Sequence, residues 1–280
     1  MLTEEQIETF DRDGFVVIPD LIDPQDCQLL RDRTSELLDA VDPSAVAAVF
    51  STNEADSNIR DSYFLDSAAG MSFFWEAEAV DEDGQLNRPK ELAVNKFGHA
   101  MHDLDPVYDR FARRLGLAEV ATDLGYGDAM LAQSMYIYKQ PGIGGEVVLH
   151  NDHAFLWTEP MRTMGLWVAL EPATLENGCL WAEPGGHRRR QQRSRMRRNG
   201  DTTFLEEWAP PYQADDTLVP LEASTGTVVA INGMCPHRSD TNRSDKSRHA
   251  YTLHIFDPKA TWVEDNWIQR PSDLPFRSWN

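Results

Sequence analysis

Just past its midpoint the chain reads Val147-Val148-Leu149-His150-Asn151-Asp152. The apolar run predicts a short β-strand. Because His150 and Asp152 lie two residues apart at the end of this run, their side chains can point to the same face and share a metal ion. The motif is short, and the alternative is a strand-end histidine that is hydrogen bonded to a nearby acid. Residues elsewhere in the chain must decide between these interpretations.

A histidine and an arginine farther along the chain supply that context. His237 follows the apolar run Gly226 to Ile231. Arg248 comes eleven residues after His237, at the start of the run His249 to Phe256. Two histidines and one carboxylate form the facial triad of non-haem iron(II) oxygenases, which leaves metal positions open for oxygen and a chelating co-substrate. A guanidinium on a neighbouring strand can hold a carboxylate beside such a metal with two hydrogen bonds.

Short β-type runs, separated by Gly, Pro and Asn, fill the second half of the chain. Their number and length predict a mainly β fold, a jelly roll or a closely related barrel. The runs are Leu131 to Lys139, Val147 to His150, Gly165 to Leu170, Gly178 to Ala182, Leu218 to Leu221, Gly226 to Ile231 and His249 to Phe256.

Helical patterns precede the β-type runs. Thr3 to Arg12 begins with a capping box, and Asp23-Pro24 supplies a cap and a first-turn proline for a second helix that extends to about Val41. A third helical pattern lies between Asp105 and Leu117. The apolar positions of the second pattern fall on one face, so we expect the helices to pack against a sheet.

Two segments are harder to place. Within residues 42–95, the sequence Asp81-Glu82-Asp83-Gly84 is a turn signal that could close a hairpin. Between Arg188 and Arg198, seven of eleven residues are arginine, which predicts a mobile surface loop. These arginines could contact an anionic substrate such as a coenzyme A thioester, or they could only neutralise nearby carboxylates.

Composition restricts the class of partner. The 280 residues are 41% hydrophobic, which is enough to build a sizeable core. With 26 basic and 46 acidic residues the formal charge is −20, so the surface should repel nucleic acid and anionic membranes. No apolar run approaches the roughly 20 residues of a membrane-spanning helix. We expect a small-molecule substrate, while the oligomeric state stays open.

The cysteines indicate the compartment. Cys27, Cys179 and Cys235 are odd in number and show no CxxC spacing, which favours reduced thiols and a cytoplasmic location. The acidic first residues also lack the pattern of a signal peptide. Cys179 and Cys235 are interpreted as small core residues. Most of the remaining histidines, His254 among them, are interpreted as structural, while a substrate contact stays the alternative for His153.

At this point the chain resembles the phytanoyl-CoA dioxygenase family of iron(II)- and 2-oxoglutarate-dependent oxygenases, and within it the branch called phytanoyl-CoA dioxygenase domain-containing protein. The resemblance covers nearly the whole length. It is carried by Asp13-Gly14-Phe15-Val16, Asn95-Lys96-Phe97-Gly98-His99-Ala100-Met101-His102, Gln133 to Pro141, His150-Asn151-Asp152, Thr174 to Trp181, Pro184-Gly185-Gly186-His187, His237 with Arg248, and Tyr251-Thr252-Leu253-His254.

The resemblance implies a fold and a domain organisation. The fold is a double-stranded β-helix, which is a cupin-like jelly roll, with N-terminal α-helices packed on one sheet. Residues 1–280 would form a single oxygenase domain. Within it, residues 1–125 would provide helical support and substrate-facing segments, and residues 126–260 would form the β-helix core.

The resemblance also implies the roles of single residues. His150, Asp152 and His237 would bind iron(II), and Arg248 would bind the distal carboxylate of 2-oxoglutarate. The positions that line the co-substrate pocket in the family correspond here to Lys96, Met135 and Trp167. The carboxylate of Asp152 distinguishes the chain from the iron halogenases of this superfamily, which have a small residue there.

The expected activity is oxidation of a small organic substrate by O2 and 2-oxoglutarate, most simply hydroxylation, with release of succinate and CO2. Desaturation and ring closure use the same metal chemistry. Two alternatives remain at this stage, namely a metal-dependent cupin-type enzyme that needs no 2-oxoglutarate and a non-catalytic binding protein of the same fold. The first is distinguished by Arg248, and the second by the presence of all three ligands.

Overall fold

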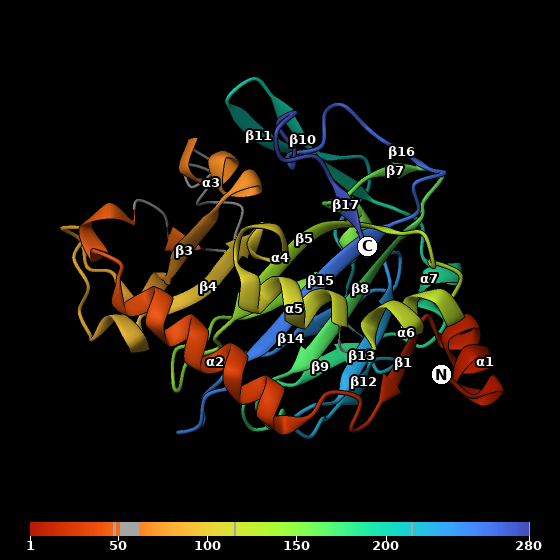
Figure 1. Ribbon diagram of the computed structural model, residues 1–280, viewed down its shortest axis with the longest axis horizontal. Coiled ribbons are helices and arrows are strands. Elements are labelled where there is room, and N and C mark those ends of the chain that lie inside the picture. Colours follow the sequence, from red (N-terminus) through yellow and green to blue (C-terminus); the bar gives the residue numbers. More distant parts are fainter. Residues whose placement is uncertain (47–48, 51–61, 115, 214, 280) are drawn as a thin grey trace.

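The computed structural model describes residues 1–46, 49–50, 62–114, 116–213 and 215–279. A large, mainly antiparallel sheet forms the centre of the molecule (Figure 1). Its strands, in spatial order, are β1 (Phe15–Ile18), β13 (Val228–Asn232), β8 (Thr163–Ala169), β15 (Ala250–Phe256), β5 (Met130–Ile137), β4 (Val94–His99), β3 (Met71–Glu76) and β2 (Val49–Phe50), and β17 (Arg277–Ser278) also pairs with β5.

A smaller antiparallel sheet packs against one face of the large sheet. It contains β12 (Val219–Leu221), β9 (Leu180–Ala182), β14 (His237–Ser239) and β6 (Val147–His150). Side chains of both sheets meet in one apolar cluster, which includes Val229 and Ala250 of the large sheet and Leu180 and Leu221 of the small one. Two packed sheets of this kind are the jelly roll that the sequence predicts.

Helices cover the other face of the large sheet, where α2 and α5 lie across the strands in Figure 1. Across the described chain the helices, in this layer and elsewhere, are α1 (Glu4–Asp13), α2 (Pro24–Asp39), α3 (Ser62–Asp66), α4 (Met101–Leu104), α5 (Pro106–Arg114), α6 (Leu117–Asp123) and α7 (Gly186–Arg189), with 3-10 turns at Pro43–Ala45, Ser67–Ala69, Ala77–Ala79, Lys90–Leu92 and Asp152–Ala154. Among the described residues no helix is long and apolar enough to cross a membrane.

The predicted helix starts are confirmed. Thr3 accepts a hydrogen bond from the backbone N–H of Gln6, whose side chain bonds back to Thr3, so the capping box is complete. Asp23 caps α2 directly before Pro24. Leu30 of α2 lies in the apolar cluster between the helices and the sheet, as the predicted face requires.

Strand alternation separates the two sides of the large sheet. In the central strand β15, Tyr251, Leu253 and Ile255 pack in the cluster under the helices. Thr252 and His254 point to the opposite face, toward the small sheet. Because side chains alternate along a strand, one strand therefore contributes both to the helix-facing core and to the space between the sheets.

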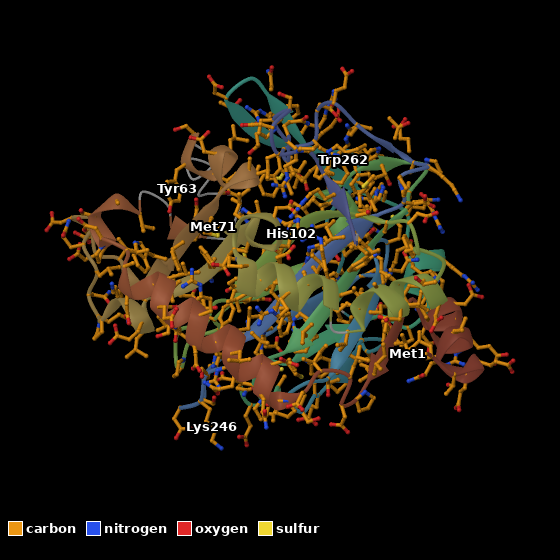
Figure 2. The ribbon with its side chains drawn as sticks, in the orientation of Figure 1. Met1, Tyr63, Met71, His102, Lys246 and Trp262 are labelled. Carbon is orange, nitrogen blue, oxygen red and sulfur yellow. The ribbon has the colours of Figure 1, made fainter. Side chains whose placement is uncertain are left out.

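The arginine-rich segment differs from its prediction. Residues 194–199 form strand β10 (Ser194–Asn199), which pairs with β11 (Thr202–Glu207) in a hairpin, so the expectation of a mobile loop is wrong. Met196 of this hairpin packs in a third apolar cluster beside Leu205 and Trp262, and Figure 2 labels Trp262 near the hairpin. Carboxylates close to the arginines, among them Asp265, neutralise their repulsion and allow the segment to order.

Two further differences concern strands. His237 begins a strand of its own, β14, which is absent from the predicted β-type runs because Cys235-Pro236 before it is typical of a turn. Strands β3 and β4 come from residues 71–99, a part of the chain where no strands were assigned, and join the large sheet. The predicted turn at residues 81–84 exists, but only an isolated bridge, Val80 with Leu86, flanks it.

Candidate metal centre and co-substrate pocket

The three predicted metal ligands meet between the two sheets. His150 ends β6 and His237 begins β14, and the register pairs these two residues directly. Asp152 follows in the 3-10 turn after β6. Its Oδ1 lies 3.8 Å from Nε2 of His150 and 3.6 Å from Nε2 of His237. One ligand atom from each residue lies within 4.8 Å of the other two, close enough to bind one metal ion.

Hydrogen bonds fix the tautomer of both histidines. Nδ1 of His150 lies 2.8 Å from the carbonyl of Val148, and Nδ1 of His237 lies 3.0 Å from the carbonyl of Cys235. Because a carbonyl can only accept, each Nδ1 must carry the proton. The Nε2 lone pairs are therefore free, and both face the carboxylate of Asp152, as metal-binding imidazoles require.

His150 and Asp152 reach their metal-binding protonation states for different reasons. Burial, followed by the nearby ring of His237, lowers the pKa of His150 to about 4, so this imidazole is neutral at pH 7. Burial alone would raise the pKa of Asp152, but the rings of His254 and His237 lower it overall. A neutral imidazole and an ionised carboxylate are the forms that bind a divalent cation.

The second oxygen of Asp152 has its own support. Nε2 of His254 lies 3.4 Å from Oδ2, and the backbone of Gly165 passes so close that a Cβ there would lie 3.0 Å from the same oxygen. His254 therefore touches a metal ligand, which its interpretation as merely structural did not foresee. His153 does not face this cluster, because its Nε2 contacts the backbone of Thr158.

Arg248 is a buried cation with an unused hydrogen-bond donor. Only 1% of its surface is exposed, its Nε donates to the carbonyl of Gly178, and its guanidinium carbon lies 5.5 Å from the ring centre of Trp167. Burial lowers the pKa of Arg248 to about 10, so it stays charged at pH 7. Nη1 is buried and has no partner in the described part of the chain. Such a donor is costly unless an anion fills the space before it.

One cavity joins the arginine to the ligand cluster. Its volume is about 640 Å³, within the usual range of small-molecule sites. The ligand cluster, Arg248 and all three predicted pocket residues, Lys96, Met135 and Trp167, line it. The register explains the arrangement: Thr252 pairs with Met135 on one side and with Trp167 on the other, so these three side chains share one face of the sheet.

The comparison with protein families agrees with this geometry. The family model described as Phytanoyl-CoA dioxygenase (PhyH) matches residues 10–250. The chain belongs to the phytanoyl-CoA dioxygenase family. It is therefore a dioxygenase of the class that uses iron(II) and 2-oxoglutarate, and the three ligand residues fit that metal in number and donor type.

Relatives with two different names align with this dioxygenase over almost its whole length. Phytanoyl-CoA dioxygenase of Arabidopsis thaliana is 44% identical over 270 residues, which cover 96% of this chain and 94% of the relative. Phytanoyl-CoA dioxygenase domain-containing protein 1 of Danio rerio is 39% identical over 287 residues, covering 99% and 98%. The crystal structure of EctD from S. alaskensis with 2-oxoglutarate and 5-hydroxyectoine superposes with a TM-score of 0.64 at 22% identity, covering 99% of this chain and 84% of EctD. That likeness confirms the fold.

Lys96 is enclosed by aromatic rings. Its ammonium lies 5.0 Å from the ring centre of Phe74 and 5.8 Å from that of Phe64. Burial lowers the pKa of Lys96 to about 7. A second buried lysine on the cavity wall, Lys139, donates to the carbonyl of Gly145 at 2.7 Å, and burial together with Arg248 lowers its pKa to about 7 as well.

Several wall residues were missed by sequence reasoning. They are Glu76, Asn95, Gln133, Lys139, Ser239, Thr252 and His254. Alternate residues of a strand share a face, so some of these residues follow from the predicted ones. Gln133 lies two residues before Met135, and Ser239 lies two residues after His237. Thr252 and His254 lie an even number of residues after Arg248. No comparable signal exists for Glu76, because the segment around it could not be assigned to strands.

Proposed function

We propose that this dioxygenase oxidises a small organic substrate, most simply by hydroxylation, with O2 and 2-oxoglutarate as co-substrates and with release of succinate and CO2. One observation supports it above the others. The ligand nitrogens of His150 and His237 converge with Asp152 in the same cavity into which Arg248 brings a buried, unpartnered donor. A metal-chelating dicarboxylate satisfies both features at once.

In this proposal each side chain has a defined task. His150, Asp152 and His237 hold iron(II). Arg248 binds the distal carboxylate of 2-oxoglutarate, and Lys96, in its protonated form, adds positive charge to the same pocket. The side chains of Met135 and Trp167 form apolar walls, which exclude bulk water from the reacting centre.

The cofactors supply the oxidising chemistry. When bound, iron(II) and 2-oxoglutarate activate O2, and one oxygen atom enters succinate while the other enters the substrate as a hydroxyl group. The protein contributes positioning. The Nδ1 hydrogen bonds of His150 and His237 hold their Nε2 atoms toward Asp152, and His254 holds the second carboxylate oxygen in place.

The proposal extends to the domain organisation, the cellular location and the partners of the enzyme. We infer that residues 1–280 act as one oxygenase domain, that the enzyme works in the cytoplasm, and that neither nucleic acid nor a membrane takes part. The net charge of −20 and three free, buried cysteines support this view.

Formation of succinate tests the proposal against the cupin-type alternative. Protein loaded with iron(II) in the presence of ascorbate should convert 2-oxoglutarate slowly to succinate even without substrate, and Asp152→Ala should abolish this conversion. Mass spectrometry measures succinate and an oxygen electrode measures O2 consumption. If O2 is consumed with no succinate formed, a dioxygenase that does not use 2-oxoglutarate is the better assignment.

A further inference from the structure

The hairpin β10–β11 and the segment that follows it form one wall of the active-site cavity. Met196 and Leu205 of the hairpin line it together with Phe64, Leu156 and Trp267 from elsewhere in the chain. All five belong to, or pack against, one apolar cluster. This part of the cavity therefore offers a substrate an apolar surface, and a polar group on that surface would determine orientation.

Most of the arginines around this hairpin are neutralised. Five of the seven between residues 188 and 198 form ion pairs with carboxylates. They are Arg188 with Asp11, Arg189 with Glu183, Arg190 with Glu183 and Asp215, Arg195 with Asp265, and Arg197 with Asp265 and Glu206. A sixth, Arg198, donates to the carbonyl of Gly200 and does not line the cavity.

Arg193 is the exception. It lines the cavity, its Nη1 donates to the carbonyl of Pro210, and its guanidinium lies 5.1 Å from the ring centre of Tyr212. Its Nε is buried without a hydrogen-bond partner. Within the ranges that the structure describes, no carboxylate forms an ion pair with it. A half-buried cation in a largely apolar cavity, with a donor to spare, is a site for an anion.

Contacts tie Arg193 to the metal motif. Tyr212, over whose ring the guanidinium lies, accepts a hydrogen bond of 3.0 Å from Nδ2 of Asn151 and donates to the carbonyl of Gln191. Asn151 is fully buried and stands between the ligands His150 and Asp152. Arg193 thus has a defined position relative to the iron, as a group that orients a substrate must have.

We propose that Arg193 binds a carboxylate of the substrate, while the substrate's apolar body packs against the cluster that includes Leu156 and Trp267. This inference rests on the proposed function and specifies its substrate class as an amphipathic carboxylic acid. A polyanion such as a coenzyme A thioester fits less well. Within the described hairpin the charged group that lines the cavity is the carboxylate of Glu207, and the arginines near Arg193 already have partners.

The test compares acids with their uncharged amides. Hexanoate, octanoate, decanoate and 3-phenylpropanoate, each beside its primary amide, are titrated anaerobically into protein loaded with iron(II) and saturating 2-oxoglutarate, with calorimetric detection. Saturating 2-oxoglutarate keeps Arg248 occupied. We expect at least one acid to bind about ten-fold more tightly than its amide, since a charge-assisted pair is lost in the amide.

Two variants decide whether Arg193 is responsible. In Arg193→Gln the preference for the acid should vanish, whereas Arg198→Gln, five residues along the same arginine-rich segment but outside the cavity, should keep it. If no acid is preferred over its amide, or if Arg193→Gln keeps the preference, the inference is wrong. Tighter binding of octanoyl coenzyme A than of octanoate would also overturn it.

The proposed function is tested separately in the same samples. The visible absorption band of the iron(II)–2-oxoglutarate complex is recorded before each titration, and Arg193→Gln should leave it unchanged. A missing band in the wild-type protein contradicts the proposed function and this inference with it. A normal band without acid preference contradicts this inference alone.

Discussion

At the scale of single residues, the proposed binding of 2-oxoglutarate rests on Arg248. Its guanidinium is buried at 1% exposure, and its Nη1 finds no protein partner among the described residues, so the folded protein keeps one charged donor for a ligand. The cation–π contact with Trp167 and the hydrogen bond to Gly178 fix its direction. An arginine held in this way is already oriented for a carboxylate, and little entropy is lost on binding.

Replacing Arg248 should therefore weaken co-substrate binding without releasing the metal. In Arg248→Ala the dissociation constant for 2-oxoglutarate should rise about 10- to 100-fold, the range expected for a lost charge-assisted hydrogen bond. The affinity of Arg248→Lys for 2-oxoglutarate should lie between those of wild type and Arg248→Ala, because lysine keeps the charge but loses the two-pronged hydrogen bonding of the guanidinium. Equilibrium dialysis measures the affinity for iron(II) and the affinity for labelled 2-oxoglutarate in each protein. Equal 2-oxoglutarate binding in wild type and Arg248→Ala would contradict the assignment.

The position of the Asp152 carboxylate can be tested through Gly165, a neighbour that is not a metal ligand. A Cβ on Gly165 would lie 3.0 Å from Oδ2, where His254 also approaches. Gly165→Ala should displace the carboxylate and lower iron(II) affinity about ten-fold. Circular dichroism should show an unchanged fold. Unaltered metal affinity in this variant would mean that Asp152 tolerates displacement or is not a ligand.

At the scale of elements, one buried carboxylate connects α4 and α5 to the C-terminal segment. The Asp103 side chain has no exposed surface and pairs with Arg113 of α5 at 2.7 Å and with Arg277 of β17 at 2.8 Å. His102 and Arg270 lie at 3.2 Å and 3.6 Å from its other oxygen. This network holds β17 beside β5, at the edge of the helix layer.

Removing the charge of Asp103 should destabilise the whole fold, because three arginines would lose their common partner. Asp103→Asn should lower the free energy of unfolding by about 3–5 kcal/mol, as is typical when one member of a buried ion pair is removed. Urea unfolding followed by circular dichroism measures the loss. Glu36→Gln, which removes an exposed partner of Arg33, serves as a control and should cost less than about 1 kcal/mol. A similar small cost for Asp103→Asn would argue against the network.

The same residue predicts an acid dependence. Burial alone would raise the pKa of Asp103, but the bond to His102 and the pairs with Arg113 and Arg277 lower it overall. A carboxyl group with a lowered pKa stabilises the folded state above its ordinary value of about 3.9, and this contribution is lost as the pH falls toward the lower folded value. Between about pH 5 and pH 3 the wild type should therefore lose more stability than Asp103→Asn, measured by urea unfolding at each pH. Parallel losses in the two proteins would contradict this.

The elements also show how far the sequence predicts the structure. Local chemistry identified the capping box at Thr3, the Asp23-Pro24 helix start and the strand before His150, because each depends on neighbouring residues. Strand β14 was missed because Cys235-Pro236 before it is typical of a turn. The order of the arginine-rich hairpin depends on Asp265, about 70 residues away, and no local pattern contains that contact.

At the scale of the whole molecule, a net charge of −20 opposes the compact state. Raising the NaCl concentration from about 0.01 M to about 0.5 M screens this repulsion, because the Debye length falls from about 30 Å to a few ångströms. We expect the melting temperature to rise by about 2–4 °C, which corresponds to about 1 kcal/mol for a chain of this size. Differential scanning fluorimetry across the salt series measures it. A falling melting temperature would mean that exposed ion pairs outweigh the net repulsion.

The metal centre also depends on the whole molecule, because its parts come from both sheets. His150 and His237 lie on the small sheet, whereas Arg248, Met135 and Trp167 come from or adjoin the large sheet. These residues could be predicted from the sequence because the motifs that contain them resemble those of the family. The tautomers fixed by Val148 and Cys235, the support from His254 and the separate position of Arg193 could be found only once the sheets were packed together.

The central claim is that one cavity binds iron(II) at the histidine and aspartate cluster and 2-oxoglutarate between that iron and Arg248. The most direct measurement is an anaerobic titration of iron(II)-loaded protein with 2-oxoglutarate, followed by visible absorption. We predict a charge-transfer band that saturates at one 2-oxoglutarate per iron and that is strongly weakened in Arg248→Ala at the same concentrations. A fully iron-loaded wild-type protein that shows no band would contradict the claim.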